Sequence, residues 1–298
     1  MAKEIIKRLG WCGLLLAIVL VGDRVFASML ERLFFESKFR FSMAYSGRLE
    51  TDVLIMGNSR GANSFHHPTL EEGLGLRAAN LSFNGLPAAM LPILLEDYLS
   101  HQPAPRVLIV EVSCVGGKRA PGTIERFSVL SSRSVGVREL QRKQNYKLYF
   151  SSEVFHLLRY NSELMWRSLA FLRKSDQSWA IQGQIGDELV EAVDAESSFK
   201  MLDQSTEDVD AIKRLIAIAD SKSIRVELVF APYLKAYRER IDDFEAWLTW
   251  MEKSLGRSIV DCSLEIEDST MFADRLHLNA KGGKEFTSIL VEKLGRMN

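Results

Sequence analysis

Short apolar runs that recur along the chain from residue 51 onward restrict the possible fold most strongly. Residues 53–56, 108–112 and 226–230 are rich in valine, leucine and isoleucine, and residues 78–82 and 258–261 are weaker runs of the same kind. Short runs that are apolar on both faces are typical of strands in a parallel sheet, which helices cover on each side. The sequence therefore predicts a buried sheet.

Helical patterns lie between these runs. Residues 88–101, 206–222, 235–255 and 279–294 carry apolar side chains at helical spacing, and the second pattern is predicted to have Thr206 as its cap. Alternation of strand and helix predicts an α/β fold with a mainly parallel sheet. Ligands of such sheets bind at the carboxyl ends of the strands.

The first residues read as a membrane anchor, 1–27. Lys3, Lys7 and Arg8 precede an uncharged run over residues 9–22, which spans about 21 Å as a helix. Flanking apolar residues extend it toward the roughly 30 Å of a bilayer core if the nearby basic side chains reach outward. The basic cluster would remain cytoplasmic, so we expect a single-pass membrane protein whose main domain is exported.

A cleaved signal peptide is the alternative reading of this segment. Cleavage would fall near Ala27, but Asp23 and Arg24 fit poorly before such a site and no A-x-A motif is present. Residues 28–50 mix aromatic and charged side chains and are expected to form an amphipathic helix or a connector at the membrane surface.

Residues 114–205 interrupt the alternation, which then resumes. We therefore expect one α/β domain over residues 51–298 with a largely helical insertion at about 114–205. Tyr160, Trp166 and Trp179 in this insertion would either stack on sugar rings or pack in the core or against the membrane.

Charge and cysteine content narrow the class of partner. The formal net charge is −1, so nothing indicates a nucleic-acid surface. Of three cysteines, Cys114 and Cys262 adjoin predicted strands and are expected to be buried free thiols, with a disulfide between them as the alternative. No metal or cofactor site is expected, because His66 and His67 are adjacent and lack further ligands nearby.

The sequence GNSRG follows the first predicted strand. Ser59 lies three residues beyond the strand, and Gly57 and Gly61 permit a tight turn into a helix. A serine there is exposed at the carboxyl edge of the sheet, where backbone N–H groups can hold an oxyanion. Taken alone, the stretch is equally typical of a plain turn.

The sequence DRLHLNAKGG, 274–283, precedes the last helix, whose predicted cap is Asn279. At this spacing the Asp274 carboxylate can orient the His277 ring while the other ring nitrogen faces a serine. A turn in which the aspartate binds its own backbone is the alternative.

A third stretch, NLSFNGLPA, ends the second strand and can present the Gly85 N–H to the same edge. Together the three stretches make the chain resemble the SGNH (GDSL-like) hydrolase superfamily. That resemblance implies a flavodoxin-like sandwich, Ser59 as nucleophile, His277 and Asp274 as its partners, and the N–H groups of Ser59 and Gly85 as oxyanion donors.

The chain departs from the family in its third block, which normally supplies an asparagine to the oxyanion hole. The stretch VLIVEVSCVGG contains no asparagine, and Ser113 or a backbone N–H around Gly116 and Gly117 would have to substitute.

The resemblance extends to membrane-anchored members that add or remove acyl groups on bacterial exopolysaccharides. It implies an O-acetyltransferase or esterase, a glycan substrate and a membrane-bound O-acyltransferase as partner. It also implies a single-pass protein of a bacterial inner membrane with its main domain in the periplasm. The alternative function is a non-catalytic scaffold in a polysaccharide modification or export complex.

Overall fold

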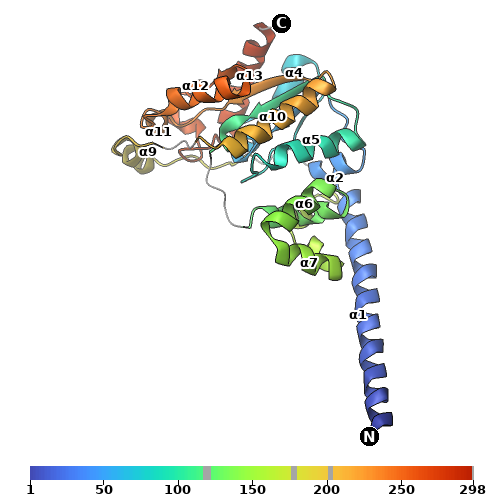
Figure 1. Ribbon diagram of the computed structural model, residues 1–298. Helices are drawn as coiled ribbons and strands as arrows, with labels where there is room; N and C mark the ends of the chain where they lie inside the picture. The colour runs from blue at the N-terminus through green and yellow to red at the C-terminus, as the bar shows by residue number, and fades with distance from the viewer. Residues whose placement is uncertain (117–121, 176–179, 201–203, 297–298) are drawn as a thin grey trace. The chain divides into compact units, whose positions relative to one another are not determined.

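A computed structural model describes residues 1–116, 122–175, 180–200 and 204–296, which fall into two compact units (Figure 1). The first unit contains residues 1–46 and 122–175, and the second contains residues 47–121 and 176–298. The predicted insertion is thus divided: its first part groups with the N-terminal segment, and its later part groups with the sheet.

The second unit contains a five-stranded parallel sheet in the order β2-β1-β3-β4-β5. This is the flavodoxin-like order, so the predicted fold class is confirmed. The central strand β1 pairs with β2 through Val53 and Ala78 and with β3 through Val53 and Val107. The strands are β1 (Val53–Met56), β2 (Ala78–Asn80), β3 (Val107–Glu111), β4 (Arg225–Phe230) and β5 (Ile259–Asp261).

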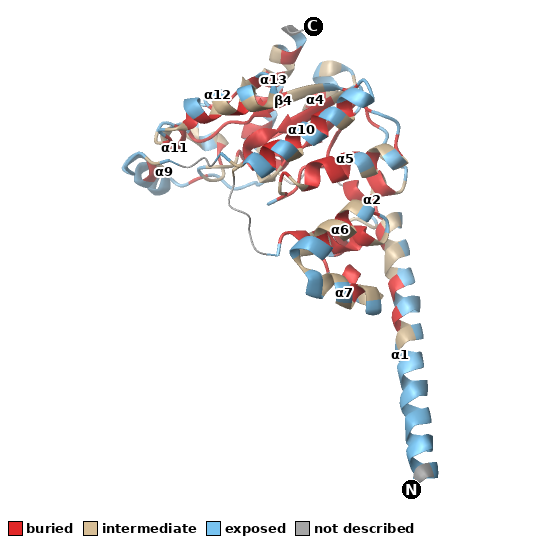
Figure 2. Cartoon of the chain, in the orientation of Figure 1, coloured by how far each residue is buried: buried red, intermediate tan, exposed pale blue. Residues whose placement is uncertain are grey.

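Helices cover the sheet in two groups. Helices α5 (Met90–His101), α10 (Thr206–Ser221) and α12 (Phe244–Leu255) pack side by side, while α3 (Ser59–Ser64), α4 (His67–Leu74) and α13 (Ala280–Arg296) form the other group. Between them, the four residues of β1 are completely buried (Figure 2). The remaining elements of this unit are α9 (Asp187–Asp194), α11 (Lys235–Arg238), η1 (Val112–Cys114) and η4 (Ser269–Met271).

Two details of the predicted helices are wrong. The pattern over 235–255 is two helices, α11 and α12, because Ile241 between them is buried and pairs with Phe199 as an isolated bridge. The cap of α10 is Ser205, whose hydroxyl accepts from the Asp208 N–H, and Thr206 is the first helical residue. The predicted cap Asn279 is confirmed, since its side-chain oxygen accepts from the N–H groups of Lys281 and Gly282.

The first unit is helical. The long helix α1 (Ala2–Glu36) passes through the predicted connector, and Phe34, Phe39, Phe41 and Phe127 are fully buried in the core of this unit. Tyr160 is buried and Trp166 is 63% exposed, while Trp179 lies outside the described residues. The other elements are α2 (Arg40–Tyr45), η2 (Ile124–Ser132), α6 (Val135–Gln144), α7 (Tyr146–Val154), η3 (His156–Tyr160) and α8 (Glu163–Ala170).

Helix α1 is long and apolar enough to cross a membrane. Its residues Lys3–Glu36 include a window with a mean hydropathy of 1.9, of which 11% is buried against the protein. Anchors and signal sequences share these properties.

The glycine pair at the start of α13 packs against backbone, which gives a test of the fold. A Cβ at Gly282 would collide with the Met271 carbonyl oxygen, whereas a Cβ at Gly295 in the same helix meets nothing within 4 Å. We expect Gly282→Ala to lower the free energy of unfolding by about 1–3 kcal/mol. In the matched control, Gly295→Ala should raise it slightly or leave it unchanged. Denaturant unfolding measures both, and equal effects would contradict this packing.

Candidate active site

The nucleophile candidate lies where β1 turns into α3. Asn58 is the residue before the helix, its side-chain oxygen accepts from the Arg60 N–H at 2.8 Å, and Ser59 is the first helical residue. Gly57 is required by close packing, because a Cβ there would lie 2.8 Å from Cβ of Glu111. The turn therefore holds a half-buried serine at the carboxyl end of the central strand.

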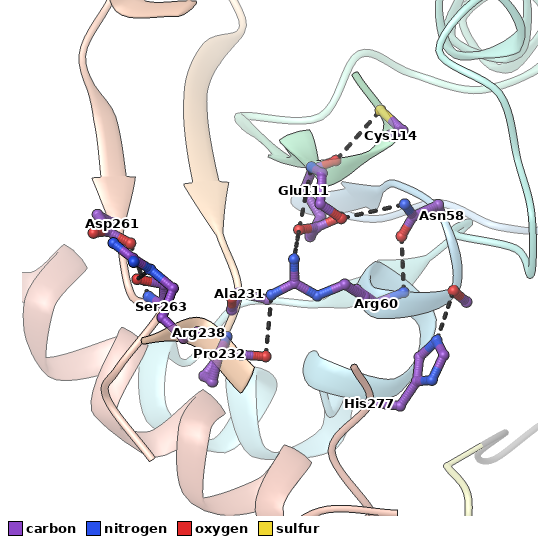
Figure 3. A network of polar contacts seen from close by, with 12 residues as sticks. Asn58, Arg60, Glu111, Cys114, Ala231, Pro232, Arg238, Asp261, Ser263 and His277 are labelled. Carbon is purple, nitrogen blue, oxygen red and sulfur yellow. Dashed lines mark hydrogen bonds and ion pairs between the residues drawn. The ribbon is translucent and has the colours of Figure 1, made fainter. Parts of the chain in front are cut away.

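His277 joins this serine to Asp274. The ring Nε2 lies 2.8 Å from Ser59 Oγ, and Figure 3 draws this contact of His277 as a dashed line. The ring Nδ1 lies 2.9 Å and 3.0 Å from the two carboxylate oxygens of Asp274. With Nδ1 protonated and donating to the carboxylate, Nε2 is left as the acceptor for the serine proton. The structure thus places the three predicted residues in one hydrogen-bonded chain, although Ser59 lies more than two hundred positions before the other two in the sequence.

The aspartate is held by its local loop as well as by the imidazole. Its Oδ1 accepts from the backbone N–H groups of Leu276 at 2.7 Å and His277 at 2.9 Å. The turn that was the alternative reading of Asp-x-x-His is therefore present, and it orients the same carboxylate toward the ring. Burial alone would raise the pKa of Asp274, but the bond to His277 and these N–H groups outweigh it and lower the pKa.

The loop after β2 lies against the nucleophile turn. The Phe83 N–H donates to the Gly57 carbonyl at 3.1 Å, and a Cβ at Gly61 would press on the Ser82 hydroxyl. Gly85 follows two residues later with a φ of +69°, a left-handed conformation that suits glycine. The predicted oxyanion loop and the predicted nucleophile thus share one edge of the sheet.

The two substitutes proposed for the missing third-block asparagine have other partners. The Ser113 hydroxyl donates to Glu111 at 2.7 Å and accepts from the Asn58 amide at 3.2 Å. The Gly116 N–H donates to Asp208 at 3.2 Å, and Gly117 lies outside the described residues. The Ser113 hydroxyl and the Gly116 N–H are thus engaged within the protein, and which group would replace the asparagine stays a prediction.

Sequence reasoning missed a buried arginine next to the nucleophile. The Arg60 side chain is 4% exposed, its guanidinium lies 3.6 Å from the centre of the Tyr233 ring, and it donates to the carbonyl oxygens of Ala231 and Pro232. One of its nitrogens lies 3.8 Å from the carboxylate of Glu111, which is completely buried (Figure 3). This side chain connects the turn after β1 with the loop after β4.

Glu111 was the signal that could have revealed this contact. It ends an otherwise apolar strand, and a carboxylate buried on both faces of a sheet needs a cation or donors nearby. The Tyr233 ring packs against the Arg60 guanidinium, and burial raises the pKa of Tyr233 to about 12.

The remaining polar candidates have structural roles. His66 caps α4 by accepting from the Thr69 N–H. Cys114 and Cys262 are buried free thiols, and burial raises the pKa of each. Within the described ranges, no three histidine, cysteine or acidic side chains are grouped so that they could hold a metal ion.

Comparison with known proteins gives structural matches alone. No family model matches the sequence, and no curated protein matches it significantly. Among solved structures, the acetyl xylan esterase AlAXEase is 9% identical with a TM-score of 0.39, over 84% of this chain and 99% of that one. A GDSL-like lipase from Bacteroides thetaiotaomicron is also 9% identical with a TM-score of 0.39, over 88% and 98%.

The strand order and the edge that carries the three motifs are those expected from the sequence. The chain resembles an SGNH hydrolase. This likeness concerns the fold and the places of the motifs; what Ser59, Asp274, His277 and Gly85 do there remains a prediction.

The lowered pKa of Asp274 predicts a pH-dependent contribution to stability. Because the folded-state pKa lies below the usual 3.8, the ionised carboxylate stabilises the fold above that value, and this contribution is lost as the pH falls through the folded pKa. Asp274→Asn lacks the contribution at every pH. We therefore expect the difference in melting temperature between wild type and variant to shrink as the pH falls below 3.8. A difference that does not change with pH would contradict this role of the carboxylate.

Proposed function

We propose that the chain is a membrane-anchored, SGNH-like serine acyltransferase or esterase that acts on O-acyl groups, most simply acetyl, of an exported polysaccharide. The observation that carries the proposal is the hydrogen-bonded chain from Asp274 through His277 to Ser59. Its geometry is that of a nucleophile, a base and a residue that orients the base.

The mechanism assigns one role to each side chain. Ser59 Oγ attacks the ester carbonyl while His277 Nε2 takes its proton, and the same ring returns the proton to the leaving alcohol as the acyl-enzyme forms. Asp274 accepts from Nδ1 and stabilises the imidazolium. A second alcohol or water then attacks the acyl-enzyme, and His277 again acts first as base and then as acid.

Charge on the tetrahedral intermediate requires donors at the same edge. The Ser59 N–H belongs to the first turn of α3, where N–H groups have no acceptor within the helix. With the N–H of Gly85, it forms the proposed oxyanion hole, and each such donor is typically worth about 3–4 kcal/mol in the transition state. Two backbone donors would then replace the usual set of three.

Membrane attachment through α1 completes the proposal. Lys3, Lys7 and Arg8 place the first end of the helix in the cytoplasm by the positive-inside rule, which puts the sheet domain in the periplasm. Retention of the anchor is supported by Asp23, whose carboxylate accepts from the N–H groups of His156 and Leu157 at 2.8 Å and 3.0 Å. Cleavage near Ala27 would leave these donors without their acceptor. The intact mass of the exported protein should therefore include residues 1–27, and a mass without them would contradict the anchor.

A polysaccharide substrate and an O-acyltransferase partner rest on the resemblance to cell-surface-modifying SGNH proteins. Esterase and transferase differ only in whether water or a sugar hydroxyl reaches the acyl-enzyme. To distinguish them, the full chain in lipid nanodiscs is given an activated acetyl ester with and without an oligosaccharide acceptor. Acetate and acetylated sugar are then measured by mass spectrometry, and Ser59→Ala serves as the control. If a folded wild-type protein forms neither acetate nor acetylated sugar, the enzyme proposal is contradicted.

The hydrogen bonds of the third block favour one alternative function, a non-catalytic scaffold. The Ser113 hydroxyl and the Gly116 N–H have partners inside the protein, and the third block lacks the asparagine of typical family members. A non-catalytic scaffold of a polysaccharide modification complex is compatible with this. It predicts co-purification with integral-membrane partners and no turnover that depends on Ser59.

A further inference from the structure

The helical unit exposes an apolar surface outside α1. Its members lie on α7, on η3 and at the residue between them, and they are 37–62% exposed. We call them the α7–η3 face: Tyr146, Phe150, Val154, Phe155 and Leu158. In Figure 2, α7 is largely pale or tan, in contrast to the buried strands. The five side chains lie within 13 consecutive positions of the sequence, and α7 packs against η3, so they are grouped in one part of the unit.

Helix α7 exposes apolar side chains and buries a polar one, the reverse of a usual surface helix. A surface helix of a globular protein turns its apolar stripe inward and its polar side outward. In α7 the residue that is buried is Ser152, whereas Tyr146, Phe150 and Val154, spaced four apart on one side, are exposed. The rings of Tyr146 and Phe150 stack on each other with centroids 6.3 Å apart. Such a helix fits an apolar or interfacial environment better than water.

Hydrogen bonds hold this face beside α1 at the position of Asp23 and Arg24 along the helix. Asp23 accepts from the backbone of His156 and Leu157, and Arg24 donates to the Val154 carbonyl at 3.0 Å. Asp23 directly follows the uncharged run that ends at Gly22. The α7–η3 face therefore lies where the apolar run of α1 ends.

The apolar surface of α1 continues past these charges. Val25, Phe26 and Met29 are 53%, 60% and 56% exposed, although they follow Asp23 and Arg24. Exposed apolar side chains thus extend along α1 from Ile5 to Met29, about 36 Å of helix. The α1 surface and the α7–η3 face are continuous at one end of this length.

We propose that the α7–η3 face is a membrane-docking surface that inserts into the interfacial layer of the bilayer spanned by α1. The inference rests on the proposed membrane anchor. Tyrosine and phenylalanine are suited to that layer, and Lys143 and Lys147, both exposed, are placed on α6 and α7 to meet lipid phosphates. Docking would fix the helical unit against the membrane instead of leaving it to pivot on α1.

The test uses an environment-sensitive NBD fluorophore on single cysteines of the full chain in vesicles of phosphatidylethanolamine and phosphatidylglycerol. Phe150→Cys and Leu158→Cys are made in a Cys12→Ser background, and the buried Cys114 and Cys262 are shielded from the reagent. Arg133→Cys is the matched control, because Arg133 pairs with Glu31, roughly 12 Å further along α1 than Asp23. Native Cys12, labelled in the otherwise unchanged chain, reports the anchor.

We expect labels at 150 and 158 to be blue-shifted and to be quenched at least twofold more by shallow nitroxide lipids than a label at 133. A label at Cys12 should be quenched by nitroxides deep in the acyl chains. If Cys12 is quenched while 150 and 158 behave like 133, the docking surface is wrong and the anchor stands. If 150 and 158 are shielded from water but not quenched by lipid, a protein covers the face and the proposal is equally wrong. If Cys12 is not quenched, the anchor fails and the docking proposal with it.

Discussion

Ser59→Ala and His277→Ala should each reduce acyl transfer from an activated acetyl ester by roughly 10⁴-fold or more, because each removes a member of a unit that acts together. The two losses should not add in the double variant, since either change alone already stops the attack of the serine on the ester. Steady-state rates of the three variants and of wild type, with the full chain in nanodiscs, measure this effect.

The matched control for this experiment is Ser288→Ala, which removes an exposed hydroxyl of α13. It should retain wild-type activity. All the proteins should melt within a few degrees of one another, because Ser59 and His277 lie at the edge of the sheet. Activity that survives in Ser59→Ala would show that another group carries the reaction.

Glu111→Ala should have the largest effect on stability. It leaves the Arg60 guanidinium buried without its carboxylate and removes the acceptor of the Ser113 hydroxyl and N–H. Removing one partner of a buried ion pair typically costs about 3–5 kcal/mol. We therefore expect the free energy of unfolding, measured with denaturant, to fall by that amount. Since Arg60 directly follows Ser59, the nucleophile turn should also lose order.

A surface ion pair serves as the comparison for this change. Glu96 pairs with Arg214 at 2.7 Å, and both side chains are about half exposed. Glu96→Ala should therefore cost less than about 1 kcal/mol. If the free energy of unfolding falls by the same small amount in both glutamate variants, the contacts of Glu111 do not stabilise this edge of the sheet.

The sheet was predictable because its sequence signals are local. Residues 53–56 are observed as predicted, the strand predicted at 108–112 lies one residue earlier at both ends, and the strand predicted at 226–230 begins one residue earlier. A strand that is buried on both faces must be apolar at every position, so it is visible in a short window. The motifs at Ser59, Gly85 and His277 were equally accessible, since each directly follows a strand or precedes a helix, and parallel strands bring such residues to one edge.

Long-range contacts of polar side chains were not predictable in this way. The partners of Arg60 lie more than 50 and more than 170 positions away, and nothing in the residues around it distinguishes a buried arginine from a solvated one. The partners of the substitutes considered for the third block were hidden for the same reason. Ser113 and Gly116 have suitable chemistry, but whether a donor is free depends on distant partners such as Asp208.

The grouping of the helical segments was also hidden. Asp23 in α1 bonds to residues 133 and 134 positions later, and this contact helps to unite the N-terminal segment with residues 122–175. A charged residue at the end of an apolar run reads as a boundary of the membrane segment, whereas here it is also a cap for η3. Only its spatial partner shows the second role.

Trapping of the acyl-enzyme tests the central claim most directly. Full-length protein in nanodiscs is mixed with an activated acetyl ester, quenched in acid, and examined by intact-mass and peptide mass spectrometry, with His277→Ala and Ser59→Ala in parallel. The proposed mechanism predicts one acetyl group on the wild type, located on Ser59, and none on either variant. A folded wild-type protein without this adduct, or an adduct that persists in Ser59→Ala, would contradict it.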